Sequence, residues 1–184
     1  MNDGIFRHQF LLAMPGGAGG NFTQSLSFIA EHNADGAMGL VINKPGDLTV
    51  SDMLSQMNIN ADIGHDRPVF WGGPVQPERG FVLHRDEGDW ESTLHVDPGL
   101  AITTSRDVLE AIGNGCGPKD YLITLGYAGW ADGQLEDEMR ANSWLSTPAD
   151  AQIIFATPIA ERWSAAARLL GVQPHQLSAH AGHS

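Results

Sequence analysis

Short apolar segments alternate with turns rich in glycine and proline along the chain. The segment at residues 10–14 is uninterrupted and closed by Pro15, which favours a buried strand over a helix. The same pattern predicts strands at residues 37–42, 69–71, 80–85, 92–96, 100–103, 121–125 and 152–156. We expect antiparallel pairing in the middle third, where Pro, Gly and Asp turns separate the strands.

Apolar residues at helical spacing predict two helices in the first third of the chain. The apolar positions between residues 22 and 29 would share one face of a helix that Asn21 caps. A short second helix over residues 50–57 should follow a cap at Thr49 or Ser51. Strands and helices therefore mix from the start.

Three further helices are predicted in the second half. Thr104 and Asp107 resemble a capping box that opens the first of them. The next should cover residues 131–141, and the last should begin at residues 157–158 and stop at Gly171. The buried stripe of the last helix should consist of Ile159, Trp163, Ala166 or Ala167, and Leu170.

The order of these elements predicts the α/β (α+β) class, with helices packed on the faces of a mixed β-sheet. No repeat, low-complexity block or long polar linker interrupts the chain. A single compact domain should therefore span residues 1–184. Residues 170–184 should form in part a mobile tail.

The chain is strongly acidic, because 10 Lys and Arg oppose 22 Asp and Glu, for a net charge of -12. Proteins that bind nucleic acid usually carry a basic patch that displaces counterions from phosphates. Direct DNA binding is therefore disfavoured, and the acidity favours solubility instead.

The single cysteine, Cys116, excludes a disulfide within the chain and fits a reducing compartment. The apolar run at residues 10–14 is too short for a signal-peptide core or a membrane span. We therefore expect a cytoplasmic protein with no membrane association. Cys116 lies in a glycine-flanked loop without a neighbouring base to activate it, which disfavours a nucleophilic role.

Two glycine-rich segments after strands are candidate anion sites, because exposed backbone N–H groups and a helix dipole can hold an anion. Residues 14–20 match neither the GxGxxG nor the P-loop spacing, which favours a flexible turn. Residues 125–130 precede an acidic helix and form either a pocket wall or part of the core. On that helix Glu136 and Glu138 lie two residues apart, so they do not face each other as an acid/base pair.

The remaining chemical motifs are weak or absent. Trp71 beside the turn at residues 72–75 could line a groove, although an aromatic residue at a strand end followed by a tight turn would give the same sequence pattern. The eight histidines form no HExxH pair, and three of them, His175, His180 and His183, lie in the expected tail. A GxSxG elbow and the kinase signatures are also missing. No metal, cofactor or catalytic motif is therefore predicted, and an enzyme is the less favoured interpretation.

Many of these segments resemble, in the same order, the YqgE/AlgH family. They are Met14-Pro15, Glu31-His32-Asn33, GAMGLVINKP at 36–45, Gly72-Gly73-Pro74-Val75, RGFVLH at 79–84, TTSRDVL at 103–109, LGYAGW at 125–130, GQLE at 133–136, NSWL at 142–145 and Gly182-His183. The resemblance implies a compact α/β fold on a mixed sheet in a bacterial cytosolic protein. The family's link to transcriptional regulation of alginate production supplies no catalytic or DNA-reading residues.

Two functions from different classes follow from these observations. The first is a regulatory or adaptor protein that acts through a protein or small-molecule partner. Its pocket would be bounded by Pro15, Gly16, Asn43, Lys44, Pro45, Gly72, Gly73, Pro74, Gly126, Tyr127, Gly129, Trp130, Gln134 and Glu136. If Gly126 lines such a pocket, Gly126→Val should abolish binding without unfolding the domain.

The alternative is an enzyme that acts on a small anionic metabolite. Helix N-termini near Gly20 and Trp130 would hold the anion. The side chains assigned to this chemistry are Lys44 or Arg79 for charge neutralisation and His84 or Glu136 for proton transfer. Direct DNA regulation would need a basic face that overrides the net charge.

Overall fold

The structure, a computed structural model, describes residues 4–15, 22–61, 67–96 and 99–171. Its strands are β1 (Gln9–Ala13), β2 (Leu26–Asn33), β3 (Gly36–Val41), β4 (Pro45–Thr49), β5 (Pro68–Trp71), β6 (Val75–Arg85), β7 (Thr93–Val96), β8 (Leu100–Thr103), β9 (Tyr121–Trp130) and β10 (Trp144–Pro148). Its helices are α1 (Val50–Gln56), α2 (Arg106–Gly113), α3 (Gln134–Arg140), α4 (Ala151–Phe155), the 3-10 turn η2 (Ile159–Glu161) and α5 (Arg162–Leu169). This composition confirms the predicted fold class.

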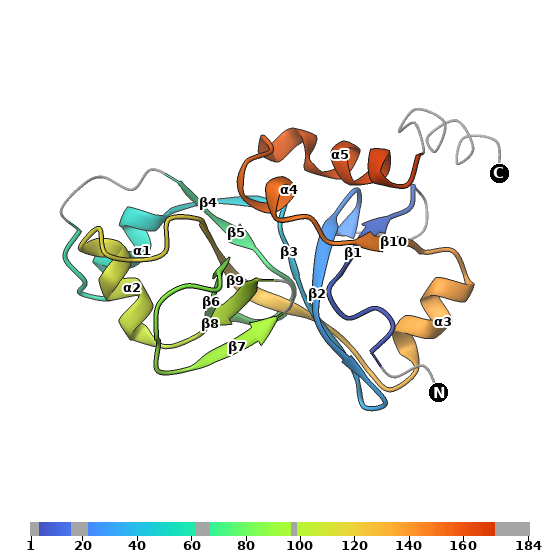
Figure 1. Cartoon of the computed structure of the whole chain (residues 1–184), viewed down its shortest axis with the longest axis horizontal. Helices are drawn as coiled ribbons and strands as arrows, with labels where there is room; N and C mark the ends of the chain where they lie inside the picture. The colour runs from blue at the N-terminus through green and yellow to red at the C-terminus, as the bar shows by residue number, and fades with distance from the viewer. Residues whose placement is uncertain (1–3, 16–21, 62–66, 97–98, 172–184) are drawn as a thin grey trace.

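The described strands join in one sheet, in the order β10-β1-β2-β3-β9-β6-β8-β7, with β4 and β5 beside this path. Neighbouring strands are antiparallel except β5 and β9, which run parallel, so the sheet is mixed as predicted. The first half of β9 pairs with β6 and its last residues pair with β3. Because the partner changes near Gly126, the sheet curls into two halves (Figure 1).

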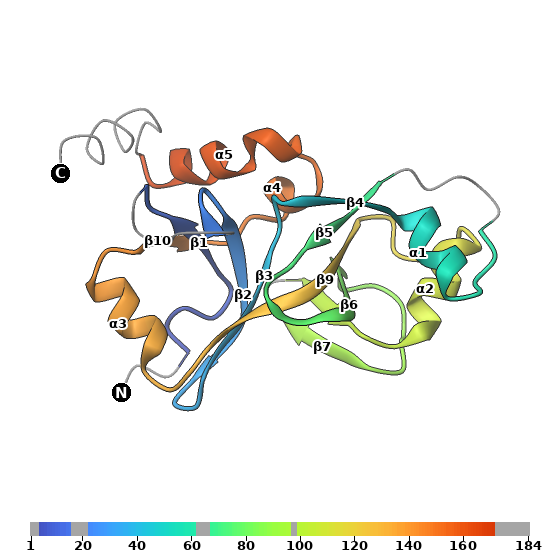
Figure 2. The ribbon, with the colours of Figure 1, turned by 180° about the vertical axis from the view of Figure 1, so that it is seen from behind.

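Helices cover this sheet at three places (Figures 1 and 2). α4 and α5 pack on the half that contains β1 and β2, where Trp163 and Phe28 belong to the main core. α3 covers the other face of that half around Leu135. α1 and α2 close the second half through Met53 and Ile112. No helix within the described ranges is long and apolar enough to cross a membrane.

The predicted start of α1 and the predicted end of α5 are confirmed, whereas α5 itself begins at Arg162, later than the expected residues 157–158. Thr49 caps α1, because its hydroxyl accepts a hydrogen bond from the Asp52 N–H while the Asp52 carboxylate accepts one from the Thr49 N–H. Gly171, at φ +74°, follows α5 where a left-handed residue can end a helix. At α2 the prediction is off by one residue: Ser105 is the N-cap, not Thr104, and its hydroxyl donates to Asp107.

The helix predicted at residues 22–29 is wrong, because this part of the chain contains β2. Residues 25–30 are all buried, since β1 and β3 pair with both edges of β2 and side chains pack on both of its faces. Leu26 and Phe28 face the main core, whereas Ile29 faces the smaller core around α3. A strand buried on both faces lacks polar alternation and can imitate helical spacing. Asn21, its expected cap, lies outside the described residues.

The strand predicted at residues 152–156 is also wrong, because α4 occupies this position. Asp150 caps α4 by accepting a hydrogen bond from the Gln152 N–H, and the buried pair Ile153 and Ile154 gave the segment its strand-like character. The strand of this region is β10, which pairs with β1 and which the sequence pattern did not indicate.

Three boundaries differ in ways that matter for the site. The expected turn at residues 43–46 is a bend at Asn43, after which Pro45 and Gly46 already belong to β4. β9 continues to Trp130, so the expected strand-to-helix corner at residues 125–130 lies inside a strand. α3 consequently begins only at Gln134.

Candidate functional site

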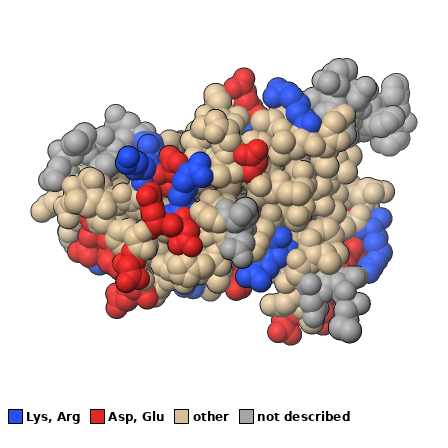
Figure 3. All heavy atoms as spheres, viewed as in Figure 1, with Lys and Arg blue, Asp and Glu red and all other residues tan. Residues whose placement is uncertain are grey.

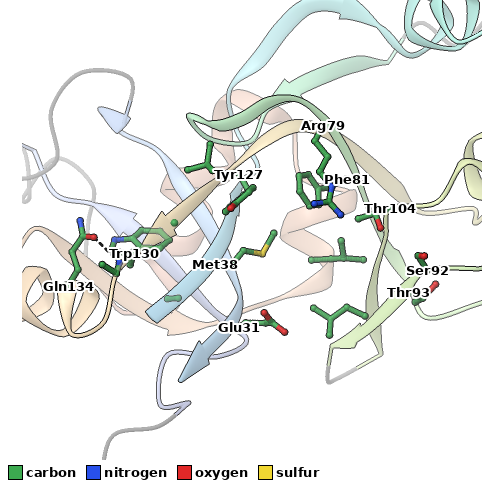
Figure 4. A pocket seen from close by; sticks show the side chains of 16 residues that line it. Glu31, Met38, Arg79, Phe81, Ser92, Thr93, Thr104, Tyr127, Trp130 and Gln134 are labelled. Carbon is green, nitrogen blue, oxygen red and sulfur yellow. Dashed lines mark hydrogen bonds between the residues drawn. The ribbon is translucent and has the colours of Figure 1, made fainter. Parts of the chain in front are cut away.

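A cavity of ≈ 950 Å³ opens where the two halves of the sheet separate, and we call it the groove. It lies between the β2–β3 hairpin on one side and β6, β7 and β8 on the other, with the end of β9 as its wall (Figure 4). Its lining consists of Glu31, Ala37, Met38, Val75, Arg79, Phe81, Ser92, Thr93, Leu94, Ile102, Thr104, Tyr127, Gly129, Trp130, Ala131 and Gln134.

The pairing of β9 with β3 gives the groove its width. Met38 lies directly opposite Gly129 in this pair, so a bare backbone position faces the methionine across the ladder. A Cβ on Gly129 would meet only side-chain atoms, at 3.5 Å from Tyr127 and 3.7 Å from Val75. A Cβ at position 129 would therefore make ordinary contacts with the groove lining and would meet no backbone clash.

The floor of the groove is apolar and firmly packed. Phe81 and Ile102 are buried and belong to the main core, and Tyr127 packs edge-on against Phe81 with ring centroids 5.7 Å apart. Met38 and Leu94 pack against the same core while remaining partly exposed. The groove therefore presents a rigid apolar surface to whatever enters it.

Two opposite charges mark the rims of the groove. Arg79 lies over the ring of Phe81, with its guanidinium carbon 5.3 Å from the centroid, and donates a 3.3 Å hydrogen bond to Gln76. Glu31 projects from β2 on the opposite side (Figure 4). Among the described residues neither side chain forms an ion pair. Each charge is therefore available to a ligand.

Glu138 holds the aromatic wall of the groove in place. Its Oε1 atom accepts hydrogen bonds from the indole N–H groups of Trp130 (2.9 Å) and Trp144 (2.8 Å). Its Oε2 atom accepts a third from Gln134, whose own Oε1 atom accepts from the Ala131 N–H. Trp130 and Gln134 line the groove, so this carboxylate fixes two lining side chains from behind.

Glu136 points elsewhere, as the spacing of the two carboxylates predicts. Its Oε1 atom lies 3.2 Å from His32 Nε2, a distance that suits an ion pair when His32 is protonated, without the geometry of a hydrogen bond. His32 Nδ1 accepts a hydrogen bond from the Phe6 N–H. Glu136 therefore ties α3 to β2 and does not line the groove.

The predicted glycines at residues 72, 73 and 126 form a tight crossing rather than a pocket. The Gly72 N–H donates to the Leu125 carbonyl, and a Cβ on Gly72 or Gly73 would overlap the backbone of β9. A Cβ on Gly126 would overlap the Gly73 carbonyl oxygen, and Gly126 has φ +79°. Gly126 does not line a pocket here, so Gly126→Val should disturb the fold rather than block a ligand. Pro74 is exposed beside this crossing.

The polar residues after β3 form hydrogen bonds to the backbone of residues 23–26. Asn43 accepts a 2.9 Å hydrogen bond from the Leu26 N–H and donates one to the Gln24 carbonyl. Lys44 donates a 2.6 Å hydrogen bond to the Thr23 carbonyl. Pro45 begins β4, Pro15 lies two residues beyond β1, and Gly16 is outside the described residues.

Of the predicted pocket residues, the groove brings together Tyr127, Gly129, Trp130 and Gln134. Arg79, expected as an anion contact, also lines it, whereas His84 does not. His84 is buried with Nε2 2.8 Å from Thr103 and Nδ1 2.6 Å from the Arg85 carbonyl, and burial lowers its pKa. The other lining residues come from β2, β3, β6, β7 and β8 and from positions next to the strands. Several of them stand in segments that resemble the family, but the sequence alone offers no reason to assign them to one pocket, because strand pairing brings them together.

A family model described as AlgH-like matches residues 10–175. The chain belongs to the AlgH-like family. The UPF0301 protein of Saccharophagus degradans is 52% identical to it over 179 residues, covering 97% of this chain and 88% of that protein. A UPF0301 protein of Thioalkalivibrio sulfidiphilus is 53% identical over 180 residues, with 97% of both chains covered. The resemblance noted in the sequence is thereby confirmed.

Two solved structures share the fold of this AlgH-like chain. The solution structure of the AlgH protein from Pseudomonas aeruginosa matches with a TM-score of 0.79 at 49% identity, covering 96% of this chain and 95% of that one. A crystal structure of a Corynebacterium diphtheriae protein matches with a TM-score of 0.71 at 18% identity, covering 97% of each chain. The second likeness concerns the fold alone.

Proposed function

We propose that this AlgH-like chain is a regulatory, cytoplasmic binding protein whose groove holds a small amphipathic molecule with one anionic group. The proposal rests on a wide apolar floor and on Arg79, the single cation among the described lining residues. A volume of ≈ 950 Å³ is near the upper end of the range usual for small-molecule sites. Such a ligand would signal its presence to a partner through the protein.

The lining favours one orientation of the ligand. An apolar body would lie against Phe81, Tyr127 and Met38, while an anionic head would reach the Arg79 guanidinium. Stacking on Phe81 limits the motion of this guanidinium, so less conformational entropy is lost when it binds an oxyanion. Glu31 on the opposite rim would repel an anion placed there.

The enzyme alternative has less support. Lys44 is occupied by a backbone carbonyl, and Trp130 ends a strand instead of preceding a helix N-terminus directly. The two side chains expected to transfer protons, His84 and Glu136, both lie outside the lining of the groove. A binding role requires none of these groups.

A transcriptional effect would be indirect under this proposal. The net charge of -12 opposes contact with DNA phosphates. On the face shown in Figure 3, acidic side chains gather over the half that carries α1 and α2, and basic side chains lie scattered among them. That distribution does not resemble the continuous basic patch of a DNA-binding surface.

The proposal is tested by titrating the ¹⁵N-labelled protein with octanoate and, separately, with octyltrimethylammonium. Both probes have the same alkyl chain and opposite head-group charge. Octanoate should shift the amide signals of Met38, Tyr127 and Gly129 saturably and should also shift the signals of Arg79, whereas the ammonium head group is repelled by Arg79 and would turn towards Glu31. Equal responses to both probes, or no response to either, would contradict the proposal.

A further inference from the structure

Arg162 is a buried cation that no carboxylate neutralises within the described part of the chain. Arg162 is the first residue of α5, and only 7% of its surface is exposed. Nη1 donates to the Ile42 carbonyl at 2.6 Å and Nε donates to the Thr157 carbonyl at 3.1 Å. Two of the five guanidinium N–H groups are thus accounted for. The side chain also lies 5.2 Å from the centroid of the Phe70 ring.

A second cavity, of ≈ 250 Å³, adjoins this guanidinium, and we call it the arginine pocket. It lies between β5, the start of β9, α4 and η2. Arg67 lines it as well, with its guanidinium carbon 4.6 Å from the centroid of the Tyr121 ring. Its apolar wall includes Phe70, Ile154 and Ile159.

Among the residues that the structure describes, no carboxylate balances the positive charge of the arginine pocket. Its described lining includes two arginines and no aspartate or glutamate, although the chain has 22 acidic residues against 10 basic ones. Among the described residues neither Arg67 nor Arg162 forms an ion pair. Burial lowers the pKa of Arg162 to about 10, which still leaves it charged at neutral pH. Keeping a buried charge unpaired is costly, so an anion in this pocket would be stabilised.

We propose that the arginine pocket binds a small organic oxyanion, a carboxylate or a phosphate monoester, between Arg67 and Arg162. Guanidinium groups match the planar geometry of such oxyanions and can donate two hydrogen bonds to one of them. The apolar wall would receive a short hydrocarbon portion of the ligand. The volume of the pocket limits that portion to a few carbon atoms. This site shares no lining residue with the groove, so it stands apart from the function proposed above.

The probes are butyrate and methyl phosphate, added to ¹⁵N-labelled full-length protein at constant ionic strength set with sodium chloride. The signals to follow are the side-chain Nε–H of Arg162 and the amides of Phe155 and Ile159. At least one probe should shift these signals saturably at millimolar concentrations. The amides of Met38 and Gly129 in the groove should stay unchanged. Absence of a saturable shift with both probes would overturn the proposal.

Two matched substitutions separate the pocket from a general charge effect. Arg67→Gln removes an exposed cation that makes no hydrogen bond to a described residue, so the domain should fold, and the probe should bind about tenfold more weakly. Arg168→Gln removes the same charge from an exposed position on α5 outside the pocket and should leave binding unchanged. Equal losses in the two variants would show a non-specific charge effect and overturn the proposal.

Arg162→Met tests the buried cation directly, since it keeps most of the apolar volume. It should abolish the saturable response at Phe155 and Ile159. Because this variant also loses two hydrogen bonds to carbonyls, its folding must be checked by its amide spectrum. If it does not fold, the comparison between Arg67→Gln and Arg168→Gln still decides the question. A folded Arg162→Met protein that binds the probe normally would exclude the site.

Discussion

Gly126 packs its backbone against the carbonyl oxygen of Gly73, at the point where β9 passes from pairing with β6 to pairing with β3. This close approach lies where the two halves of the sheet diverge, and the groove opens between those halves. The glycine-rich segments of the sequence therefore shape the candidate site without lining it, except at Gly129.

The first prediction concerns this crossing. Gly126→Val should lower the free energy of unfolding by about 3 kcal/mol or more, because a positive φ and a backbone overlap both oppose the new side chain. Gly115→Val is the control, since Gly115 has φ +77° with open space around it and should cost only about 1 kcal/mol. Urea denaturation measures the free energy of unfolding of both variants. Similar losses of stability would show that the backbone overlap at Gly126 adds no cost.

The second prediction concerns Arg79. Arg79→Gln should weaken octanoate binding about tenfold, because a charge-assisted contact to the head group is lost. Its thermal stability should stay close to that of the unchanged protein, since Arg79 is exposed and hydrogen-bonded only to Gln76. Arg140→Gln, an exposed charge removal on α3, is the matched control. Isothermal titration measures the octanoate affinity of both variants. Equal affinities would contradict the role of Arg79.

The third prediction concerns Glu138. Glu138→Ala should destabilise the domain by roughly 2–4 kcal/mol, because the indole N–H groups of Trp130 and Trp144 lose their acceptor. The two indole N–H signals should also move in the NMR spectrum. Glu161→Ala, at an exposed position, should change neither property. Unchanged indole signals in Glu138→Ala would show that these hydrogen bonds do not form in solution.

The fourth prediction is a pH dependence that arises from His84. Burial lowers the pKa of His84 below 6.5, although its hydrogen bond to the Arg85 carbonyl and the charges of Asp86 and Glu87 oppose this shift. The unfolded chain therefore takes up a proton at a higher pH than the folded one, so stability should fall as the pH drops below about 6.5 towards the lowered value.

Thermal melting between pH 5 and 8 measures this dependence. The same series on His84→Gln serves as the control, because glutamine can accept from Thr103 and does not titrate. The slope below pH 6.5 should be shallower in the variant. Parallel curves for the two proteins would assign the acid sensitivity to other groups.

Local sequence signals predicted the elements that have clear boundaries. The expected cap at Thr49 or Ser51 marked the start of α1, and turns on both sides marked β8. The signals failed where tertiary packing decided the outcome. Residues 25–30 are buried on both faces of β2, which removes the alternation that identifies a strand. At α4 two buried isoleucines outweighed the cap at Asp150.

Most of the predicted site residues that the groove brings together are neighbours in the sequence, and Arg79 is the exception. Tyr127, Gly129, Trp130 and Gln134 come from one segment with a visible pattern. Glu31 and Met38 lie opposite each other in the β2–β3 hairpin and reach the groove because β3 pairs with the distant β9, which the spacing of residues along the chain does not encode. The arginine pocket illustrates the same limit, since Arg67 and Arg162 are far apart in the sequence.

The central claim, that the groove binds the ligand, is tested most directly by octanoate titrations of Gly129→Leu followed by NMR. The Cβ of the new side chain would meet Tyr127 and Val75 at ordinary contact distances and no backbone atom, so we expect the leucine to occupy part of the groove while the domain still folds. Ser55→Leu, on the exposed face of α1, is the control for added apolar surface. We predict at least a tenfold loss of octanoate affinity in Gly129→Leu and none in Ser55→Leu. A folded Gly129→Leu protein that binds octanoate as tightly as the unchanged chain would contradict the proposed function.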